Sequence, residues 1–354
     1  MNTTRKKLAV VLFNLGGPDR PEAIKPFLLN LFRDPAILRV PGPVRFFLAR
    51  IIAFARVKPA TEIYALLGGR SPLLELTQRQ ADALQAALPE FDTKCFIAMR
   101  YWHPMSLQTA CAVRDFAPDE ILLLPLYPQY STTTTGSSLT AWREAAATAG
   151  LVACTTALCC YPEDPAFIAA TATLLRERLH DFRRTVPENT AIRILFSAHG
   201  LPEKIIRTGD PYQNQIERST AAIRAALGES IDWVICYQSR ATPVKWIGPS
   251  TEEEIERAGH DKLAIVVVPI AFVSDHSETL VELDIEYAAL AEKSGVPAYT
   301  RVPVQNDFPP FIAALANLAR RALAAGPGLC ALTDGKLCPR THTQCPHRLA
   351  GIAA

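Results

Sequence analysis

The stretch 262–287, KLAIVVVPIAFVSDHSETLVELDIEY, decides the fold of this chain. It opens with a continuous apolar run, LAIVVVPIAFV, which is typical of a β-strand buried on both faces of a parallel sheet. Ser274 or Asp275 can then cap a helix, and the residues that follow repeat with helical spacing. The pattern therefore predicts a buried strand that leads into a helix at the carboxyl end of a sheet.

The predicted helix is acidic on one face and apolar on the other. At about 100° per residue, the acidic face holds Asp275, Glu278, Glu282 and Glu286, and His276 lies at its first turn. An amphipathic helix of this kind is often an ordinary surface helix. However, open α/β sheets place their chemistry at the carboxyl ends of their strands. We therefore treat these side chains as candidate ligands for metal ions or protons, with the surface helix as the alternative.

The same succession of strands occurs twice. In the first half, apolar segments end in the turns of AVVLFNLGGPD, CFIAMRYWHP and EILLLPLYPQYSTTTTGSS; in the second half they end in those of IRILFSAHGLP, DWVICYQSRATP and LAIVVVPIAFVSDHSET. Helical patterns lie between them, for example at 71–88 and 210–227. Alternating strands and helices predict parallel sheets with right-handed crossovers. We expect an α/β protein with two similar Rossmann-like domains whose parallel sheets face a shared cleft.

Length and composition are those of a globular protein with two domains. The chain has 354 residues, of which 49% are hydrophobic and 20% charged. We place an N-terminal α/β domain at 1–160, a C-terminal α/β domain at 161–305, and a C-terminal helix with a cysteine-rich tail at 306–354. The net charge of +2 gives no basic surface for nucleic acid. Monomer and homodimer both remain open.

The N-terminal domain carries an apolar insertion at about 25–70. Its segment PFLLNLFRDPAILRVPGPVRFFLARIIAFARVKPA is studded with cations: Arg33, Arg39, Arg45, Arg50, Arg56 and Lys58. Such a segment suits a membrane surface, or an apolar lip over an amphiphilic acid whose carboxylates the arginines bind. The alternative is a pair of core helices whose arginines reach out to solvent.

The sequence predicts no membrane-spanning helix. No stretch approaches the roughly 18 apolar residues that a spanning helix needs, and the first apolar run lacks the cleavage site of a signal peptide. We expect a cytoplasmic protein with peripheral contact to the inner face of the membrane through residues 26–60.

Cysteines gather in the tail, at Cys330, Cys338 and Cys345, together with His342 and His347. The chain has nine cysteines, and without a secretory signal these indicate reduced thiols or metal ligands. Thiols in a loop-like tail favour an iron–sulfur or metal site. The residues that could supply a fourth thiolate are Cys154, Cys159 and Cys160. A zinc site that uses a tail histidine, and thiols without a ligand, are the alternatives.

His199 directly follows another buried strand, in FSAHGLP. Its turn corresponds to the one that carries His276 and Glu278, and an imidazole there can bind Fe²⁺ or Zn²⁺ or take a proton near neutral pH. A purely structural histidine is the alternative. Aromatic side chains near other strand ends offer flat walls for a flat ligand, unless they are plain packing: Tyr101, Trp102, Tyr127, Tyr130, Tyr237 and Trp246.

Motifs along nearly the whole chain resemble the ferrochelatase family, which inserts ferrous iron into a porphyrin at the end of haem synthesis. They are FNLGGP (13–18), GGRSPL (68–73), MRYWHP (99–104), LPLYPQYSTTTTGSS (124–138), FSAHGLP (196–202), YQSRATPVKWIGPST (237–251) and SDHSETLVELDIEY (274–287). The resemblance implies a two-domain chelatase fold with a porphyrin cleft.

The resemblance also implies roles for individual residues. His199 and Glu278 would be the catalytic and metal-site pair. The acidic path for Fe²⁺ would include His276, Asp275, Glu282 and Glu286. The residues expected to bind the porphyrin are Arg100, Tyr101 and Trp246, with Leu15, Tyr130 and Ser131 from the same motifs.

The tail resembles that of bacterial members of the family with C-terminal cysteines. Some members bind a [2Fe–2S] cluster with such cysteines and one from elsewhere, so the resemblance implies Cys330, Cys338 and Cys345 as ligands. In animal-type members the remaining cysteine lies in the YPQYS segment, where this chain has Thr132. We therefore place the fourth ligand at Cys160 or Cys159.

We expect a lyase that inserts Fe²⁺ into protoporphyrin IX to form protohaem, the last step of haem biosynthesis. The alternatives are a coproporphyrin III ferrochelatase, a cobalt chelatase, and a tetrapyrrole or metal carrier without turnover. The titratable pair His199 and Glu278 favours an enzyme. Which of the two takes the pyrrole protons and which delivers the metal stays open.

Overall fold

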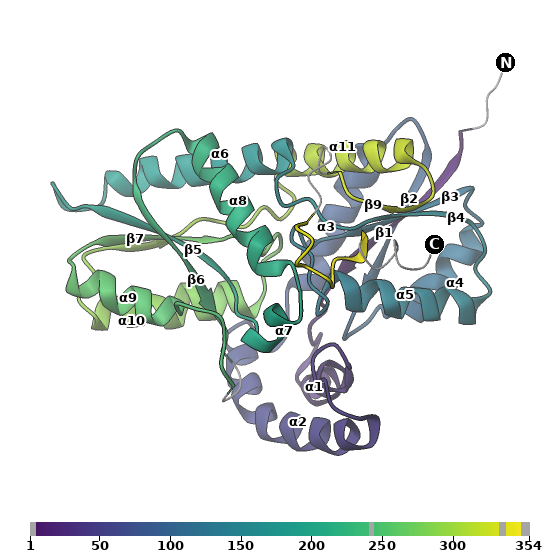
Figure 1. Ribbon diagram of the computed structural model, residues 1–354, viewed down its shortest axis with the longest axis horizontal. Helices are drawn as coiled ribbons and strands as arrows, with labels where there is room; N and C mark the ends of the chain where they lie inside the picture. The colour runs from purple at the N-terminus through teal and green to yellow at the C-terminus, as the bar shows by residue number, and fades with distance from the viewer. Residues whose placement is uncertain (1–4, 241–243, 333–337, 348–354) are drawn as a thin grey trace. The chain divides into compact units, whose positions relative to one another are not determined.

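The computed structural model describes residues 5–240, 244–332 and 338–347. It divides into two compact units, coloured along the chain in Figure 1. Unit 1 comprises Met1–Cys160 and Ile312–Leu337, and unit 2 comprises Tyr161–Phe311 and Cys338–Ala354. The segment 306–354, which the sequence analysis set apart, is thus distributed over both units. Parts of two predicted motifs, 241–243 and the tail at 333–337 and 348–354, lie outside the described residues.

Unit 1 is built on a five-stranded parallel sheet with the order β2-β1-β3-β4-β9. Figure 1 shows α4 and α5 on one face of this sheet and α11 on the other. Its strands are β1 (Lys7–Asn14), β2 (Asp92–Met99), β3 (Glu120–Pro125), β4 (Cys154–Leu158) and β9 (Gly328–Cys330). Its helices are η1 (Pro21–Ala23), α1 (Ile24–Arg33), α2 (Gly42–Ala65), α3 (Leu73–Ala86), α4 (Ser106–Phe116), α5 (Thr135–Ala149) and most of α11 (Pro309–Ala325).

Unit 2 is built on a four-stranded parallel sheet with the order β6-β5-β7-β8. In Figure 1, α9 and α10 cover one face and α6 and α8 the other. Its strands are β5 (Ile192–His199), β6 (Asp232–Gln238), β7 (Ala264–Pro269) and β8 (Tyr299–Arg301). Its helices are α6 (Pro165–Arg183), α7 (Glu203–Arg207), α8 (Tyr212–Leu227), α9 (Thr251–His260), η2 (Glu278–Glu286) and α10 (Tyr287–Lys293).

The two sheets share one strand order, because β2-β1-β3-β4 of unit 1 matches β6-β5-β7-β8 of unit 2. The predicted pair of parallel α/β domains is thereby confirmed, and so are the predicted helices at α3 and α8. The sequence analysis missed β4, β8 and β9, which are short and lack a continuous apolar run. Only the long buried strands carry a strong apolar pattern.

The central strands hold each unit together by burying side chains on both faces. Every residue of β7 is buried, as is every residue of β1 after Lys7. On one face of unit 1, Val11 and Phe13 pack against Trp142 of α5. On one face of unit 2, Leu195 and Val267 pack against residues of α9, η2 and α10. Each fully buried side chain of this size contributes roughly 1.5–3 kcal/mol, so the strand ends rest on rigid elements.

The helix after β7 differs from the prediction of α-helical spacing from Ser274 or Asp275. Its first part, η2, is a π-helix, in which the N–H of Tyr287 bonds back to the carbonyl of Glu282, five residues earlier. Only from Tyr287 onward is it an α-helix, α10. Four residues are slightly more than one α-helical turn of about 3.6 residues and slightly less than one turn of the wider π-helix. Side chains four residues apart therefore remain on one side of η2.

Candidate active site

Three titratable side chains meet in unit 2 beside the carboxyl ends of β5 and β7. His199 is the last residue of β5, Glu278 is the first of η2, and His276 lies in the connection between β7 and η2. The two carboxylate oxygens of Glu278 face different rings. Oε1 lies 3.6 Å from Nε2 of His199, and Oε2 lies 3.6 Å from Nε2 of His276. The structure thus brings His199 together with His276 and Glu278, which lie far from it in the sequence.

Backbone carbonyls fix the orientation of both imidazoles. Nδ1 of His199 donates to the carbonyl of Gly200 at 2.6 Å, and Nδ1 of His276 donates to the carbonyl of Ser274 at 3.0 Å. Because a carbonyl oxygen only accepts, each Nδ1 carries the hydrogen. Each Nε2 is then left to face Glu278, where it can offer a lone pair to a metal ion or hold a proton.

The charges at this site stabilise one another. Burial, the largest single effect, would raise the pKa of Glu278, but His199 and His276 outweigh it and lower that pKa to about 2. Burial would likewise lower the pKa of His276, but its hydrogen bond and charge interaction with Glu278 raise it. Glu278 is therefore a carboxylate over the whole physiological range, and His276 holds its proton to a higher pH than a free imidazole.

Glu282, one step further along η2, has a different environment. Its carboxylate accepts hydrogen bonds from the backbone N–H of Ser239 at 2.9 Å, from Gln238 Nε2 at 2.9 Å and from the Tyr287 hydroxyl at 3.1 Å. Burial and the nearby charge of Glu278 raise its pKa. The same helix therefore carries a strongly acidic and a weakly acidic carboxyl group side by side.

The remaining acidic candidates lie at the edges of this row. Glu286, at the end of η2, is exposed. Asp275 forms an ion pair with Arg301 at 3.2 Å and accepts hydrogen bonds from Thr279 and Asn306 at 2.8 Å. Asp275 therefore anchors the connection that leads into η2.

Trp246 lies against Gly200, the residue that follows His199. An added Cβ at Gly200 would be 3.3 Å from Cε3 of Trp246 and 3.0 Å from the carbonyl oxygen of Gln238. Only a glycine lets the indole ring come so close to the backbone after β5. Trp246 is half-buried, so part of its flat ring remains accessible.

The other predicted porphyrin-binding residues belong to unit 1. Arg100 and Tyr101 directly follow β2, and Leu15 follows β1. The Arg100 guanidinium is 2.7 Å from the carboxylate of Asp34, and the fully buried Tyr101 donates its hydroxyl to the same carboxylate at 2.8 Å. Leu15 is half-buried, whereas Tyr130 and Ser131 are buried.

The cysteines lie in two groups, one in each unit. In unit 1, the backbone N–H of Cys159 donates to the carbonyl of Cys330 at 2.9 Å, and burial together with the charge of Cys160 raises the pKa of Cys330 to about 11. In unit 2, a hydrogen bond with Cys345 and burial raise the pKa of Cys338. All five are buried. Over the parts of the chain that the structure describes, no three His, Cys, Asp or Glu side chains form a group able to hold a metal ion.

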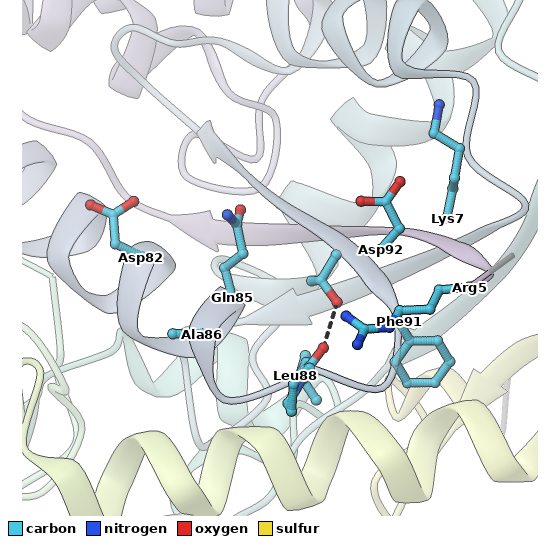
Figure 2. A pocket seen from close by; sticks show the side chains of 10 residues that line it. Arg5, Lys7, Asp82, Gln85, Ala86, Leu88, Phe91 and Asp92 are labelled. Carbon is cyan, nitrogen blue, oxygen red and sulfur yellow. Dashed lines mark hydrogen bonds between the residues drawn. The ribbon is translucent and has the colours of Figure 1, made fainter. Parts of the chain in front are cut away.

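A separate hollow in unit 1, shown in Figure 2, lies at the opposite end of the sheet. Lys7 and Asp92, the first residues of β1 and β2, line it, and Thr93 donates to the carbonyl of Leu88 at its wall at 3.1 Å. None of the predicted site residues lines this hollow.

Sequence reasoning missed several residues that shape the site. Gln238 and Ser239 hold Glu282, Arg301 holds Asp275, and Asp34 and Ser137 hold Arg100. Gln238, Ser239 and Ser137 lie inside the quoted motifs, which could have drawn attention to them. Asp34 and Arg301 lie outside those motifs, and their partners are distant in the sequence.

Comparison with known proteins gives one consistent family. A family model described as Ferrochelatase matches residues 7–323. The ferrochelatase of Caulobacter vibrioides is 52% identical over 347 residues, which cover 97% of this chain and 98% of the relative. That of Phenylobacterium zucineum is also 52% identical, over 98% of this chain and 100% of the relative. Among solved structures, SirB from Bacillus subtilis with Fe³⁺ aligns with a TM-score of 0.51 at 13% identity, over 90% of this chain and 96% of that one.

The parallel α/β units, with titratable side chains at a strand end, define an α/β protein of the chelatase fold. The chain belongs to the ferrochelatase family. Membership confirms the predicted enzyme class, a lyase that inserts iron into a porphyrin in haem biosynthesis. Within the described residues, no helix has the length and apolar character needed to cross a membrane.

The contact between Glu278 and His276 predicts a measurable pKa change. Glu278→Gln removes the carboxylate charge and leaves the ring buried, so the pKa of His276 should fall. A titration of the histidine ring resonances by NMR measures this. Glu292→Gln, at an exposed position on α10, should leave the pKa of His276 as it is. An unchanged pKa in Glu278→Gln would show that Glu278 does not govern His276.

Proposed function

We propose that this chain inserts Fe²⁺ into protoporphyrin IX and forms protohaem, with His199 and Glu278 as the groups that act on the metal and the ring. The observation that carries the proposal is the 3.6 Å approach of Glu278 to Nε2 of His199, whose Nδ1 is held by a backbone carbonyl. Coproporphyrin III is the alternative porphyrin.

The reaction needs groups of these two kinds. Two pyrrole N–H bonds break and release two protons, and all four pyrrole nitrogens bind Fe²⁺ as it loses its water ligands. No electron is transferred. A neutral imidazole with a bare Nε2 can take a proton near neutral pH. A carboxylate that stays charged can hold the incoming cation, which fits the low pKa of Glu278. The two roles can also be reversed, because His199 and Glu278 lie within 3.6 Å of each other.

The acidic path is the second part of the proposal. Glu278 and Glu282 are partly accessible, and Glu286 is exposed at the far end of η2. We propose that this row, with His276 and Asp275 at its foot, passes ferrous iron and protons between solvent and His199. The spacing of four residues supports this role, because it keeps the three carboxylates on one side of the helix.

For the porphyrin we propose contacts with Trp246, Arg100 and Leu15. In unit 2 the accessible part of the Trp246 ring offers a flat wall beside Gly200. In unit 1 we assign Arg100 and Leu15, which retain some exposure, to direct contact. The more deeply buried residues of this region are assigned to holding these contact residues in place: Tyr101, Tyr130 and Ser131.

Helix α2 gives the basis for a membrane proposal. Its residues Val44, Phe47, Ile51 and Phe54 follow one another at helical spacing and are all exposed, Phe54 to 76%. Arg50 lies over the Phe46 ring at 3.4 Å on the same helix. An exposed apolar face with neighbouring arginines suits the surface of an anionic membrane. We therefore propose a cytoplasmic protein that binds the membrane peripherally through this face of α2.

We further propose a [2Fe–2S] cluster with Cys330, Cys338, Cys345 and either Cys160 or Cys159 as ligands. Its support is that these thiols are buried, lie near one another within each unit, and are of the type that iron–sulfur clusters use. The raised pKa values of Cys330 and Cys338 describe protonated thiols, and a bound metal would deprotonate them. When bound, the cluster would stabilise the fold and take no part in iron insertion.

His199→Ala should lower iron insertion by about 10²-fold or more, as expected when a proton-transfer group is lost. The measurement is anaerobic metalloporphyrin formation with protoporphyrin IX and with coproporphyrin III, alongside circular dichroism. His180→Ala, at an exposed position on α6, should keep full activity. Near wild-type turnover in folded His199→Ala would refute the assignment, and porphyrin binding without turnover in the unmodified protein would favour a carrier.

For the cluster, protein purified without oxygen should be reddish and contain about two iron and two sulfide per chain. Cys330→Ser, Cys338→Ser and Cys345→Ser should each abolish the colour, and so should one of Cys159→Ser and Cys160→Ser. Cys154→Ser, at an exposed position, should retain it. If the purified protein contained stoichiometric zinc and no sulfide, the tail would be a zinc site and the proposed cluster would be wrong.

For the membrane, the protein should sediment with vesicles that contain phosphatidylserine, and the double variant Ile51→Asp/Phe54→Asp should not. Two charges on the exposed face oppose insertion into the apolar part of the bilayer. The matched control is Val152→Asp, because Val152 is an exposed apolar residue outside α2. Equal sedimentation of both variants would contradict the assignment of α2.

A further inference from the structure

The carboxylate of Asp34 is a buried meeting point of hydrogen bonds in unit 1. Asp34 follows α1, and its side chain is only 2% exposed. Its Oδ2 accepts hydrogen bonds from the Tyr101 hydroxyl at 2.8 Å and from the Ser137 hydroxyl, and lies 2.7 Å from Nη2 of Arg100. Its Oδ1 accepts from the backbone N–H of Ala36 at 2.8 Å.

These bonds connect three segments that are far apart in the sequence. Asp34 belongs to the connection between α1 and α2, Arg100 and Tyr101 follow β2, and Ser137 lies in the first turn of α5. A further bond, from Asn30 Nδ2 to the carbonyl of Tyr101 at 3.1 Å, joins α1 to the same strand end. The apolar insertion is thereby fastened to the carboxyl end of the sheet.

The network also holds the Arg100 guanidinium in one orientation. Nε donates to the Ser137 hydroxyl at 2.6 Å, Nη2 pairs with Asp34, and the group lies 4.9 Å from the centre of the Tyr101 ring. Nη1 makes no hydrogen bond with any of the described residues, and the side chain is 19% exposed. One nitrogen of a fixed guanidinium thus remains available to a ligand.

A buried ion pair is a poor means of stabilising a fold, because the desolvation of both charges offsets their attraction. It is a good means of orienting a group, because a guanidinium whose rotamers are already restricted loses less entropy when it binds a carboxylate. The arrangement of Asp34 therefore suits the preparation of Arg100 for an anionic ligand.

We infer that Asp34 is a positioning residue for iron insertion, which orients Arg100 so that its Nη1 binds a carboxylate of the porphyrin. The inference rests on the proposed function, because the porphyrin supplies the carboxylate. Asp34 itself touches neither the metal nor the ring. In the same network it fixes the connection that leads into α2.

Asp34→Asn tests the inference, since it removes the charge but keeps the shape and lets Tyr101 and Ser137 continue to donate. Porphyrin binding in the absence of iron, followed by absorbance, should weaken by roughly tenfold, the usual effect of losing one charge-assisted hydrogen bond. The KM for porphyrin should rise similarly, and kcat should change by no more than about twofold. Unchanged or tighter porphyrin binding would overturn the inference.

A matched control separates orientation from stability. Asp164 is as buried as Asp34, since 4% of the whole residue is exposed in each, and it caps α6 by accepting from the N–H groups of Ala166 and Phe167. Asp164→Asn should lower the unfolding temperature but leave porphyrin affinity unchanged. Equal losses of porphyrin affinity in Asp164→Asn and Asp34→Asn would show that reduced stability alone accounts for the effect.

A double-mutant cycle tests whether Asp34 acts through Arg100. If it does, Asp34→Asn should weaken porphyrin binding in the native background but have no further effect in Arg100→Gln. Additive losses would overturn the inference. If Asp34→Asn does not fold, Ser137→Ala removes the partner of Nε and one hydroxyl donor to Asp34, and it should weaken porphyrin binding less, in the same direction; unchanged binding in this variant would then count against the inference. Failure of the unmodified protein to insert iron into any porphyrin would instead refute the proposed function.

Discussion

The site in unit 2 depends on a single partly buried carboxylate held between two imidazoles. Glu278 remains charged because His199 and His276 face its two oxygens and outweigh the effect of burial. The rings can do so because backbone carbonyls hold their other nitrogens. The carbonyl of Gly200 directly follows β5, and that of Ser274 lies in the connection after β7; these buried strands cannot shift without disturbing the core. The electrostatics of the site are therefore a consequence of how the parallel sheet is packed.

The duplicated fold carries different chemistry on its two halves. Both units place polar groups at the carboxyl end of their parallel sheet, as expected for open α/β sheets. In unit 2 this end holds His199 and the acidic row of η2, which can exchange protons and bind cations. In unit 1 it holds the ion pair of Arg100 and Asp34, whose guanidinium can donate to a carboxylate. One half is suited to metal and proton transfer, the other to recognition of an anion.

The two helices that connect β1 to α3 also differ in character. Helix α1 buries one face and is fastened to the sheet through Asn30 and Asp34. Helix α2 leaves a row of large apolar side chains exposed, which is costly in water unless a partner covers them. Of the two interpretations of this segment, α1 has the packed face of a core helix and α2 has an exposed apolar surface. The helix that meets the sheet is the packed one.

Local patterns in the sequence determined the parallel α/β class, the duplication, the long buried strands, and the helices α3, α8 and α11, because apolar periodicity reports burial directly. The quoted motifs also singled out His199, His276 and Glu278, whose proximity the structure shows. Only the tertiary structure decided that η2 is a π-helix, since nine residues are too few to separate its spacing from that of an α-helix. It alone showed that Asp34 reaches Arg100 and that Arg301 reaches Asp275. Such ion pairs join residues distant in the chain, and their formation depends on how the sheet and its connections pack, which no local pattern records.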